Sequence, residues 1–511
     1  NENRVLVAYT LLEAHSATTL RLRPFLAFRS VNKLTEKNTV ANTDYVEVEN
    51  GVSFCMYEGY PNLVMQTNKQ MQWVAEPNWY DGIEYSKEAE RGYAFKEDLF
   101  VPGYFELSIK KGETIVFSAG TEAISPRKMK RLFEDEKETR KERPDFMACL
   151  KASADQFHNC LSDGSYLLAG CPWFDYRARD QFISLPGVTL YADKDKVFDE
   201  IMERAVVALR EFMNGETATT RLKEIDAPDV VLWAVWAIQQ YAQAVSFEEC
   251  IKKYGQALEE IILYIIGNKH PNLFVHENGL VYSDGREKSI SWMTTLAEGG
   301  RPATYRTGYL VEFNALWYNA LRFVADLAME FGEEHFSESL TEYADKVKEN
   351  FAEVFWNGYY LYDFVSGDYK ELSVRPNMIF AASLKYSPLE NKQKKAIVDI
   401  ATKELLTPKG LRSLSPKSPN YHGTCDGSQQ DRDFAAFQGA AWPWLIGPYL
   451  EAYLSVYKNS GYSFAERTLI GFEEEMHLNC IGTLSEMYDA NPPFKGRGGI
   501  SFTKNVAEVL R

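Results

Sequence analysis

The first 120 residues contain short runs in which apolar and polar positions alternate, and turn-forming residues separate these runs. A period of two is typical of strands that bury one face. The pattern predicts an antiparallel β-sandwich. Its expected strands are Val5–Leu12, Thr18–Phe28, Asp44–Glu49, Val52–Tyr57, Leu63–Gln66, Phe105–Ile109 and Thr114–Ser118.

From residue 145 onward the apolar positions recur with the spacing of helices. The expected helix Leu310–Phe331 is apolar on two sides, which is typical of a helix buried in a helical layer. About twelve helices that alternate between exposed and buried fit a double ring, an (α/α)6 toroid. They are Met147–Leu161, Arg179–Leu185, Lys194–Met213, Val230–Val245, Glu249–Ile266, Leu310–Phe331, Glu338–Phe355, Pro376–Tyr386, Asn391–Leu405, Asp433–Lys458, Glu466–Asn479 and Lys504–Leu510.

Residues 125–144 mix acidic and basic side chains at helical spacing, which predicts a solvated linker helix. A basic binding patch is the less favoured alternative, because the chain as a whole is acidic. The expected organisation is therefore mainly α. A β-rich domain at 1–122, which we expect to be incomplete, precedes a linker helix at 123–146 and a toroid at 147–511.

Composition narrows the possible partners. The net charge of −16 argues against binding to nucleic acid or to an anionic membrane surface, and it fits a neutral substrate. Aromatic residues make up 14% of the chain, which suits carbohydrate binding but also a large packed helical core. No apolar run is long enough to predict a membrane span.

The cysteines are dispersed, odd in number and without a Cys-x-x-Cys pair, which favours a reduced compartment. No secretory signal is visible, so we expect a cytoplasmic protein. The chain opens with Asn1 rather than Met, and we expect the natural N-terminus to lie upstream. The cysteines are Cys55, Cys149, Cys160, Cys171, Cys250, Cys425 and Cys480.

Candidate chemistry is dense in Leu168–Leu190. Two aromatic residues, Trp173 and Phe174, precede a charged group that includes Arg179 and Asp180. Aromatic rings stack on sugar faces while Arg and Asp bind hydroxyl groups, so this stretch fits a sugar pocket. A buried Arg179–Asp180 pair that fixes the start of a helix is an equally open interpretation.

The same stretch resembles the signature that opens the amylo-α-1,6-glucosidase domain of glycogen debranching enzymes. The family has Trp-Gly before its Arg-Asp pair, whereas this chain has Arg177-Ala178. An earlier segment, Leu22–Arg29, is similar to the middle of that family's N-terminal domain. The matching residues of the signature are Gly170, Pro172, Trp173, Phe174, Arg179, Asp180, Phe182, Ile183, Leu185, Pro186, Gly187 and Leu190.

Glycoside hydrolysis needs two carboxyl groups that flank the scissile bond. The segment Ile481–Asp489 resembles the family's C-terminal signature, and the resemblance implies that Glu486 is the general base of an inverting mechanism. A surface glutamate near a turn is the plain alternative. Just beyond it, Ser501–Lys504 replaces the family's Gln-Ala-Trp stretch.

The expected general acid is replaced. Ser291–Thr294 resembles the family's Trp-Met-Asp motif, but Thr294 stands where the acidic Asp is expected. A threonine hydroxyl is too weak an acid to donate a proton at neutral pH. Glu298 and Glu312 are the two possible donors. Glu312 matches a family residue that lines the sugar site, and the alternative is a buried glutamate satisfied by Arg306 or another helix.

Further matches imply substrate-binding roles for residues that are spread over the chain. One more departure is Ala436-Phe437, where the family has Tyr-His. The expected substrate-binding residues are Trp173, Arg179, Asp180, Asp229, Trp292, Arg306, Trp317 and Trp442.

The resemblance implies hydrolysis of α-1,6-glucosidic branches of glycogen or a related α-glucan. The altered pocket motifs leave two alternatives: a catalytically impaired glucan-binding relative, and an inverting toroid glycosidase that acts on another sugar. Histidines are scattered, and neither metal-ligand spacing nor a nucleotide motif occurs. We therefore expect no metal and no organic cofactor.

Overall fold

The computed structural model describes residues 3–31, 33–140, 142–479 and 482–511, so Asn1 and Cys480 lie outside the described residues. The chain forms two compact units, Asn1–Glu142 and Arg143–Arg511. Within the described ranges, no helix is long and apolar enough to cross a membrane. The same ranges hold no group of His, Cys, Asp and Glu side chains that could bind a metal ion.

The first unit is an antiparallel sandwich, as the alternating pattern predicts. One sheet has the order β1 (Arg4–Thr10), β8 (Thr114–Gly120), β5 (Leu63–Thr67), β4 (Gly51–Phe54) and β3 (Tyr45–Val48). The other has the order β2 (Thr18–Leu22), β7 (Lys96–Ile109) and β6 (Gln72–Glu84). Side chains from both sheets, such as Phe54 and Phe105, share one buried core.

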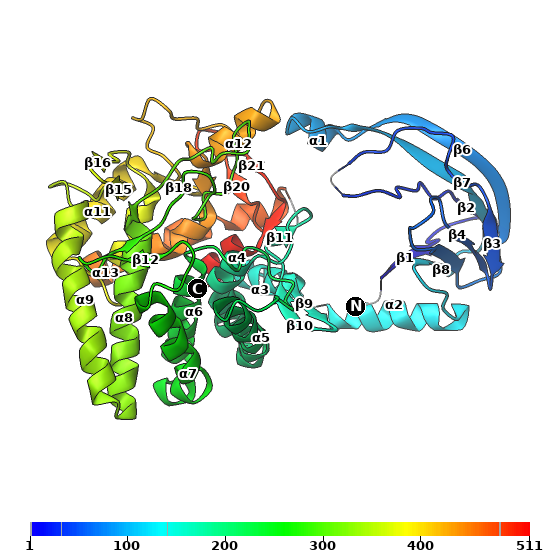
Figure 1. Ribbon diagram of the computed structural model, residues 1–511. Coiled ribbons are helices and arrows are strands. Elements are labelled where there is room, and N and C mark those ends of the chain that lie inside the picture. Colours follow the sequence, from blue (N-terminus) through cyan, green and yellow to red (C-terminus); the bar gives the residue numbers. More distant parts are fainter. Residues whose placement is uncertain (1–2, 32, 141, 480–481) are drawn as a thin grey trace. The chain divides into compact units, whose positions relative to one another are not determined.

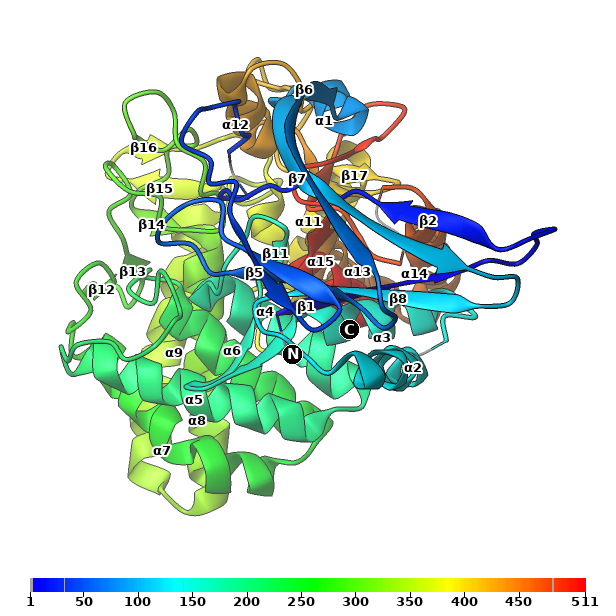
Figure 2. The same cartoon turned by 90° about the vertical axis from the view of Figure 1, so that its right-hand side faces the viewer.

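The long strand β6 has no counterpart among the predicted strands, and it pairs with an equally unpredicted extension of β7 (Figure 2). Pro77, Asn78 and Gly82 interrupt its apolar pattern and resemble turn residues. The strand tolerates them because it is the edge of its sheet and its register shifts twice, between Ala75 and Asn78 and between Tyr80 and Ile83.

The mixed-charge segment is helical over η1 (Pro126–Lys128) and α2 (Met129–Thr139), a shorter stretch than predicted. Helix α2 contacts β1 and β8, and Met129 is fully buried. A short helix, α1 (Ser86–Glu90), connects β6 to β7.

The second unit is a double ring of helices, which confirms the (α/α)6 toroid. In the described residues, six inner helices contact one another in sequence, and the last returns to the first. They are α4 (Ala178–Thr189), α6 (Val230–Ala244), α8 (Val311–Phe331), α10 (Ile379–Ser383), α13 (Ile446–Tyr457) and α15 (Thr503–Leu510). Each is flanked by an outer helix: α3 (Phe146–Phe157), α5 (Asp195–Met213), α7 (Phe247–Ile266), α9 (Glu334–Phe355), α11 (Asn391–Glu404) and α14 (Tyr462–Ile470).

The two rings follow from the apolar pattern of each helix. Inner helix α8 is buried along most of its length, whereas its outer partner α9 buries a stripe that includes Leu340, Ala344, Val347 and Phe351. A stripe at this spacing covers one face only and leaves the other to solvent. Figure 1 shows α8 and α9 lying side by side.

One predicted helix, Asp433–Lys458, is wrong. The chain there forms α12 (Gln429–Phe437), β19 (Ala441–Trp442), η4 (Pro443–Leu445) and then α13. Gly439 has φ +158°, and a Cβ there would lie 2.3 Å from the carbonyl oxygen of His422. Pro443 lacks the N–H that a continuous helix requires, so the helix restarts after it.

A second correction concerns the end of α4. The predicted helix Arg179–Leu185 ends just before Pro186-Gly187, but the helix continues through both residues to Thr189. At Gly187 an added Cβ would lie 2.1 Å from the carbonyl oxygen of Ala507 in α15. The glycine therefore permits close packing of two inner helices rather than ending one of them.

This contact gives a stability prediction. Gly187→Ala is expected to lower the free energy of unfolding by about 1–3 kcal/mol, because the helix backbones must separate. The matched control is Gly255→Ala in α7, where the nearest atom to a Cβ is a methyl of Ile251 at 3.6 Å. That change should stabilise by about 0.5–1 kcal/mol, since alanine favours helix. Urea unfolding measures both, and equal effects would contradict this interpretation.

Short strands join the helices at the loops. β11 (Gly170–Cys171) pairs with β22 (Ser501–Phe502), which brings the Leu168–Leu190 motif next to the C-terminal one. A small sheet of β17 (Leu406–Thr407), β18 (Gly410–Arg412), β19, β20 (Met487–Tyr488) and β21 (Gly496–Arg497) lies beside the Glu486 segment. The remaining elements are β9 (His158–Leu161), β10 (Gly164–Leu167), η2 (Leu190–Ala192), β12 (Phe274–Val275), β13 (Val281–Tyr282), β14 (Tyr309–Leu310), β15 (Phe364–Ser366), β16 (Tyr369–Lys370), η3 (Pro376–Met378), η5 (Lys458–Gly461) and η6 (Glu473–His477).

Candidate active site

The Glu486 segment is fixed by the start of helix α15. The side-chain amide of Asn505 donates to the carbonyl oxygens of Ser485 (2.6 Å) and Glu486 (2.8 Å). The N–H of Thr503 donates to the carbonyl of Ala169, just before the first motif. Residues more than 300 positions apart in the chain therefore meet around one glutamate.

The carboxylate of Glu486 is half-buried and accepts a hydrogen bond of 2.7 Å from the N–H of Gly499. The backbone fits closely, because a Cβ at Gly498 (φ +67°) would lie 2.2 Å from the Oε2 of Glu486. Burial raises the pKa of Glu486 to about 7, although the Gly499 hydrogen bond, Arg177 and Lys504 oppose this. A carboxylate with this pKa suits proton transfer near neutral pH.

Glu486 differs from the fully buried carboxylates of the second unit, and within the described ranges it shares the lack of an ion pair with other half-buried carboxylates such as Asp326 and Glu371. Among the described residues, each fully buried carboxylate there forms an ion pair with a Lys or Arg, whereas Glu486 forms none. A buried charge is normally paired, so an unpaired carboxyl is available to act on a ligand. The pairs are Asp180–Lys504, Asp229–Arg179, Glu312–Arg306, Asp363–Arg306, Glu404–Lys417, Glu475–Lys409, Asp489–Arg497 and Glu508–Arg511.

Arg179 and Asp180 are both buried at the start of α4, but their ion-pair partners lie elsewhere in the chain. Arg179 binds the two oxygens of Asp229 at 2.6 and 2.8 Å, and the indole N–H of Trp233 donates to the same carboxylate at 3.2 Å. Asp180 lies 2.6 Å from the ammonium of Lys504. The interpretation as an Arg179–Asp180 pair is therefore wrong in its partners, although both side chains do fix the helix start.

An aromatic wall adjoins these charges. Trp292 packs edge-on against Phe437, Trp442 and Trp444, with ring centroids 5.2–5.3 Å apart. The wall continues from Trp442 to Phe502 (6.3 Å) and from there to Phe174 (5.2 Å). Trp292 and Trp442 are almost fully buried, so they support the site from within the core and offer almost no ring surface to a ligand.

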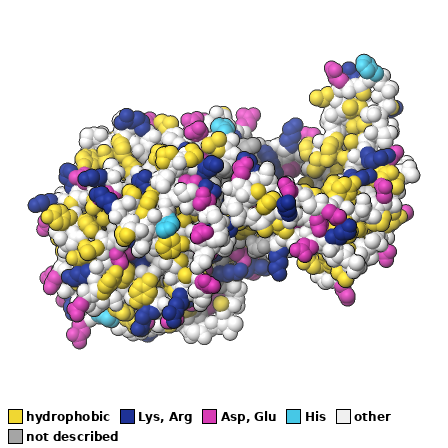
Figure 3. All heavy atoms as spheres, turned by 90° about the horizontal axis from the view of Figure 1, so that it is seen from above, with side chains coloured by type: hydrophobic (Ala, Val, Ile, Leu, Met, Phe, Trp, Pro, Cys, Tyr) yellow, Lys and Arg dark blue, Asp and Glu magenta, His cyan; other side chains and the backbone are white. Residues whose placement is uncertain are grey.

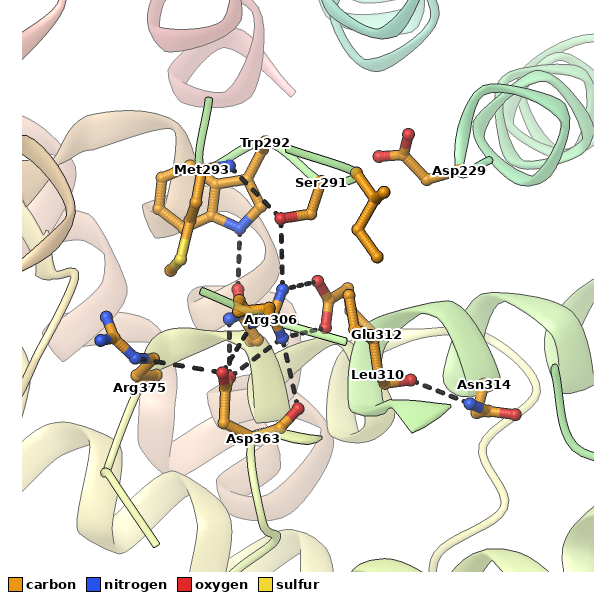
Figure 4. Close-up of polar contacts among 12 residues, drawn as sticks. Asp229, Ser291, Trp292, Met293, Arg306, Leu310, Glu312, Asn314, Asp363 and Arg375 are labelled. Atoms are coloured by element: carbon orange, nitrogen blue, oxygen red, sulfur yellow. Dashed lines mark hydrogen bonds and ion pairs between the residues drawn. The ribbon is translucent and has the colours of Figure 1, made fainter. Parts of the chain in front are cut away.

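Figure 4 shows a second charged cluster behind Trp292. Both carboxylate oxygens of Glu312 accept from the guanidinium of Arg306, whose Nε also donates to Asp363 at 2.7 Å. The structure therefore contains the Glu312–Arg306 pair that the sequence analysis gave as an alternative. Burial raises the pKa of Glu312 and Arg306 opposes this, but the side chain is only 2% exposed and is therefore closed to a substrate.

The two clusters are joined through the segment that contains Trp292. The guanidinium of Arg179 reaches the carbonyl of Ile290 at 3.4 Å, and Arg306 donates to the hydroxyl of Ser291 at 3.3 Å. The indole N–H of Trp292 donates to Asn377 (2.7 Å), which in turn donates to Asp363 (2.7 Å). Arg179, Asp180, Asp229, Trp292, Arg306, Glu312, Trp442 and Glu486 thus belong to one connected region.

Three predicted residues, Trp317, Glu298 and Trp173, are not among those of this region. Trp317, which was expected to bind substrate, has no exposed surface, and its indole N–H donates to the carbonyl of Gly279 (3.2 Å), so it offers no surface to a ligand. Glu298 is exposed on a loop closed by a bridge between Leu296 and Pro302, next to the half-buried Thr294. Trp173 is half-buried in the loop before α4.

Three further residues belong to the site, although the family pattern does not point to them. Lys504 and Arg177 were noted only as replacements, yet both lie close enough to Glu486 to lower its pKa. Asp363 was missed, although it joins Arg306 to Asn377. A lone lysine in the apolar run Thr503–Leu510 was a usable signal, because a buried lysine requires an anionic partner.

Acidic and basic side chains are interspersed on the face of the molecule shown in Figure 3. The net negative charge is not gathered into a patch of one sign on that face.

Comparison with known proteins decides the family. Residues 151–511 match the family described as amylo-alpha-1,6-glucosidase, and residues 1–116 match the family described as glycogen debranching enzyme N terminal. The chain belongs to the amylo-alpha-1,6-glucosidase family. It is a member of the debranching-enzyme-like glycoside hydrolases, and both of its units match debranching-enzyme domains.

Individual relatives are distant. The chain is 25% identical over 389 residues to the glycogen debranching enzyme of Saccharomyces cerevisiae (strain ATCC 204508 / S288c), a match that covers 56% of this chain and 25% of that protein. It thus spans about a quarter of that relative's length. A bacterial glucoamylase crystallised with acarbose shares the fold, with a TM-score of 0.54, 12% identity, and coverage of 90% of this chain and 72% of that one.

Proposed function

We propose that the toroid binds a branched α-glucan at the Glu486 pocket and hydrolyses its α-1,6-glucosidic bonds slowly, with inversion. Glu486 serves as the base that activates water. Turnover is weak because Thr294 stands where the family has its acid. The assignment of linkage and substrate rests on the family, since the yeast relative is named a glycogen debranching enzyme.

One observation supports the role of Glu486 most strongly. Glu486 forms no ion pair with a Lys or Arg among the described residues, and burial raises its pKa to about 7. An inverting base has to be ionised and accessible to a water molecule. The paired carboxylates around it are ionised, but they are buried against their cations and therefore less accessible to water.

The ion pairs formed by the other carboxylates also support weak turnover. Asp180 is held by Lys504, and both oxygens of Glu312 are held by Arg306. Lys504 and Arg177 hold the pKa of Asp180 below its ordinary value despite its burial, so Asp180 is a poor proton donor. Burial raises the pKa of Glu312, but its side chain is only 2% exposed and is bound to Arg306, so it is closed to a substrate. Losing the general acid typically costs on the order of 10²–10⁴ in rate.

Thr294→Asp tests the missing-acid explanation. We expect this change alone to raise glucose release by less than about tenfold, because Arg177, Phe437 and Lys504 also differ from the family pattern. Release of glucose from a dextrin with single α-1,6 stubs is the measurement, with Thr295→Asp as the neighbouring control. A gain of a thousandfold would show that the acid alone was missing.

An active enzyme with Glu298 as donor is the second candidate. Glu298 is exposed on the loop beside Thr294, so a loop movement can bring its carboxyl toward a bound sugar. If this holds, wild-type release is fast, and Glu298→Gln lowers it by on the order of 10²-fold while binding is kept. Under our proposal Glu298→Gln changes the slow release by less than about twofold.

A further inference from the structure

Lys504 is a residue that the family's pattern does not supply, and the structure places it at the centre of the site. Its side chain is 4% exposed and its ammonium lies 2.6 Å from the Oδ1 of Asp180. The same ammonium lies 5.1 Å from the ring centroid of Trp444 and 5.2 Å from that of Phe502. A buried lysine held by one carboxylate and two aromatic rings has little freedom to move.

Helix α15 holds Lys504 and the Glu486 segment in fixed relation. Lys504 and Asn505 are consecutive, and Asn505 donates to the carbonyl of Glu486 at 2.8 Å. The carbonyl of Asn505's side chain accepts from the N–H of Trp444 (3.0 Å). Because α15 also packs closely on α4 at Gly187, the helix that bears Asp180 is part of the same rigid assembly.

We propose that Lys504 is a positioning residue that holds the buried Asp180 carboxylate beside Glu486 and compensates its negative charge there. Its role in turnover rests on the proposed function of Glu486, but its effect on the charge of the pocket does not. Without Lys504, two carboxyl groups would share the pocket with Arg177 as the cation that remains near both. Like charges at short range disfavour each other's ionisation.

The charged groups around Glu486 come from several elements. Arg177 precedes α4, Asp180 lies in α4 and Lys504 lies in α15, while the thiol of Cys425 faces Glu486 from the loop before α12. Arg177 and Lys504 favour the ionised Glu486, and Asp180 disfavours it. The pKa of Asp180 itself lies below its ordinary value, because Lys504 and Arg177 outweigh its burial.

The test measures the pKa of Glu486 by a pH titration that is monitored with infrared spectra of the carboxyl groups. The signal of Glu486 is the difference between the spectrum of each variant and that of the same variant with Glu486→Gln added. In Lys504→Met we expect the pKa of Glu486 to rise by on the order of one pH unit. Lys504→Arg should keep it near the wild-type value. Lys504→Met combined with Asp180→Asn should move it back, because the uncompensated charge is gone.

An unchanged titration in Lys504→Met, in a protein whose circular dichroism shows native helix content, would overturn the proposal. If Lys504→Met fails to fold, the test uses the double variant Lys504→Met with Asp180→Asn. This double variant removes both charges of the pair, so no unpaired charge stays buried. Its titration must then lie near that of wild type, and a value more than about one unit higher also overturns the proposal. Neither the titration nor the circular dichroism requires glucan. A negative result for Lys504 can therefore be distinguished from a negative result for the proposed hydrolysis.

Discussion

Arg306→Met is expected to lower the free energy of unfolding by about 3–5 kcal/mol at neutral pH. The change leaves two buried carboxylates, Glu312 and Asp363, without the cation that both now share. All three side chains are at most 2% exposed, so water cannot replace the lost partner. Arg375 lies 3.9 Å from Asp363 and is too far away to compensate both charges. Chemical denaturation measures the loss.

Two controls separate this loss from general damage. Arg286→Met removes an ion pair with Asp284 whose arginine is 65% exposed, and it should cost less than about 1 kcal/mol. Arg306→Met combined with Glu312→Gln should recover part of the stability, because one of the unpaired charges is gone. If Arg306→Met lowers the free energy of unfolding by less than about 1 kcal/mol, the buried cluster of Arg306, Glu312 and Asp363 does not stabilise the fold as proposed.

Glu486→Gln is expected to reduce the slow glucose release by at least on the order of 10²-fold, with glucan affinity changed by less than about threefold. The amide keeps a carbonyl oxygen that can accept from Gly499 but cannot take a proton from water. Wild-type activity should fall as the pH drops through about 7, where Glu486 becomes protonated. Equal activity of the two proteins would contradict the assignment of the base.

The same variant has an opposite effect on stability. The folded-state pKa of Glu486, about 7, lies above its ordinary value of 4.5, so protonation favours the folded protein. This contribution is complete below about pH 4.5 and is lost as the pH rises to about 7. Glu486→Gln should therefore be more stable than wild type by about 1–3 kcal/mol at pH 8 and nearly equal to it at pH 4.5. Thermal melts at both values measure this.

The apolar pattern predicts the fold of both units correctly, but it does not predict every helix and strand. It separates the inner helix α8 from the striped outer helix α9, because burial on all sides and on one side leave different patterns. It fails at β6, where an edge strand tolerates Pro77 and Gly82. It also fails at Gly439, where a close approach of His422 breaks a helix that the local pattern favours.

The sequence predicts which residues form the site better than it predicts which of them contact one another. The charged residues of the first motif do lie in the site, but the partner of Arg179 is Asp229, 50 positions away. The partner of Asp180 is Lys504, on the last helix. Such pairs depend on the closure of the ring, so spacing along the chain cannot reveal them. Glu312 and Arg306 are six positions apart, and that pair could be anticipated.

The most direct test of the proposed function measures glucan binding and hydrolysis on one protein preparation. The ligand is a dextrin with single α-1,6-linked glucose stubs, with calorimetry for binding and an enzymatic glucose assay for release. We predict measurable binding, together with release slower than the typical enzymatic rate of ~10 s⁻¹ by on the order of 10²–10⁴. Release near ~10 s⁻¹, or no binding at all, would contradict the account.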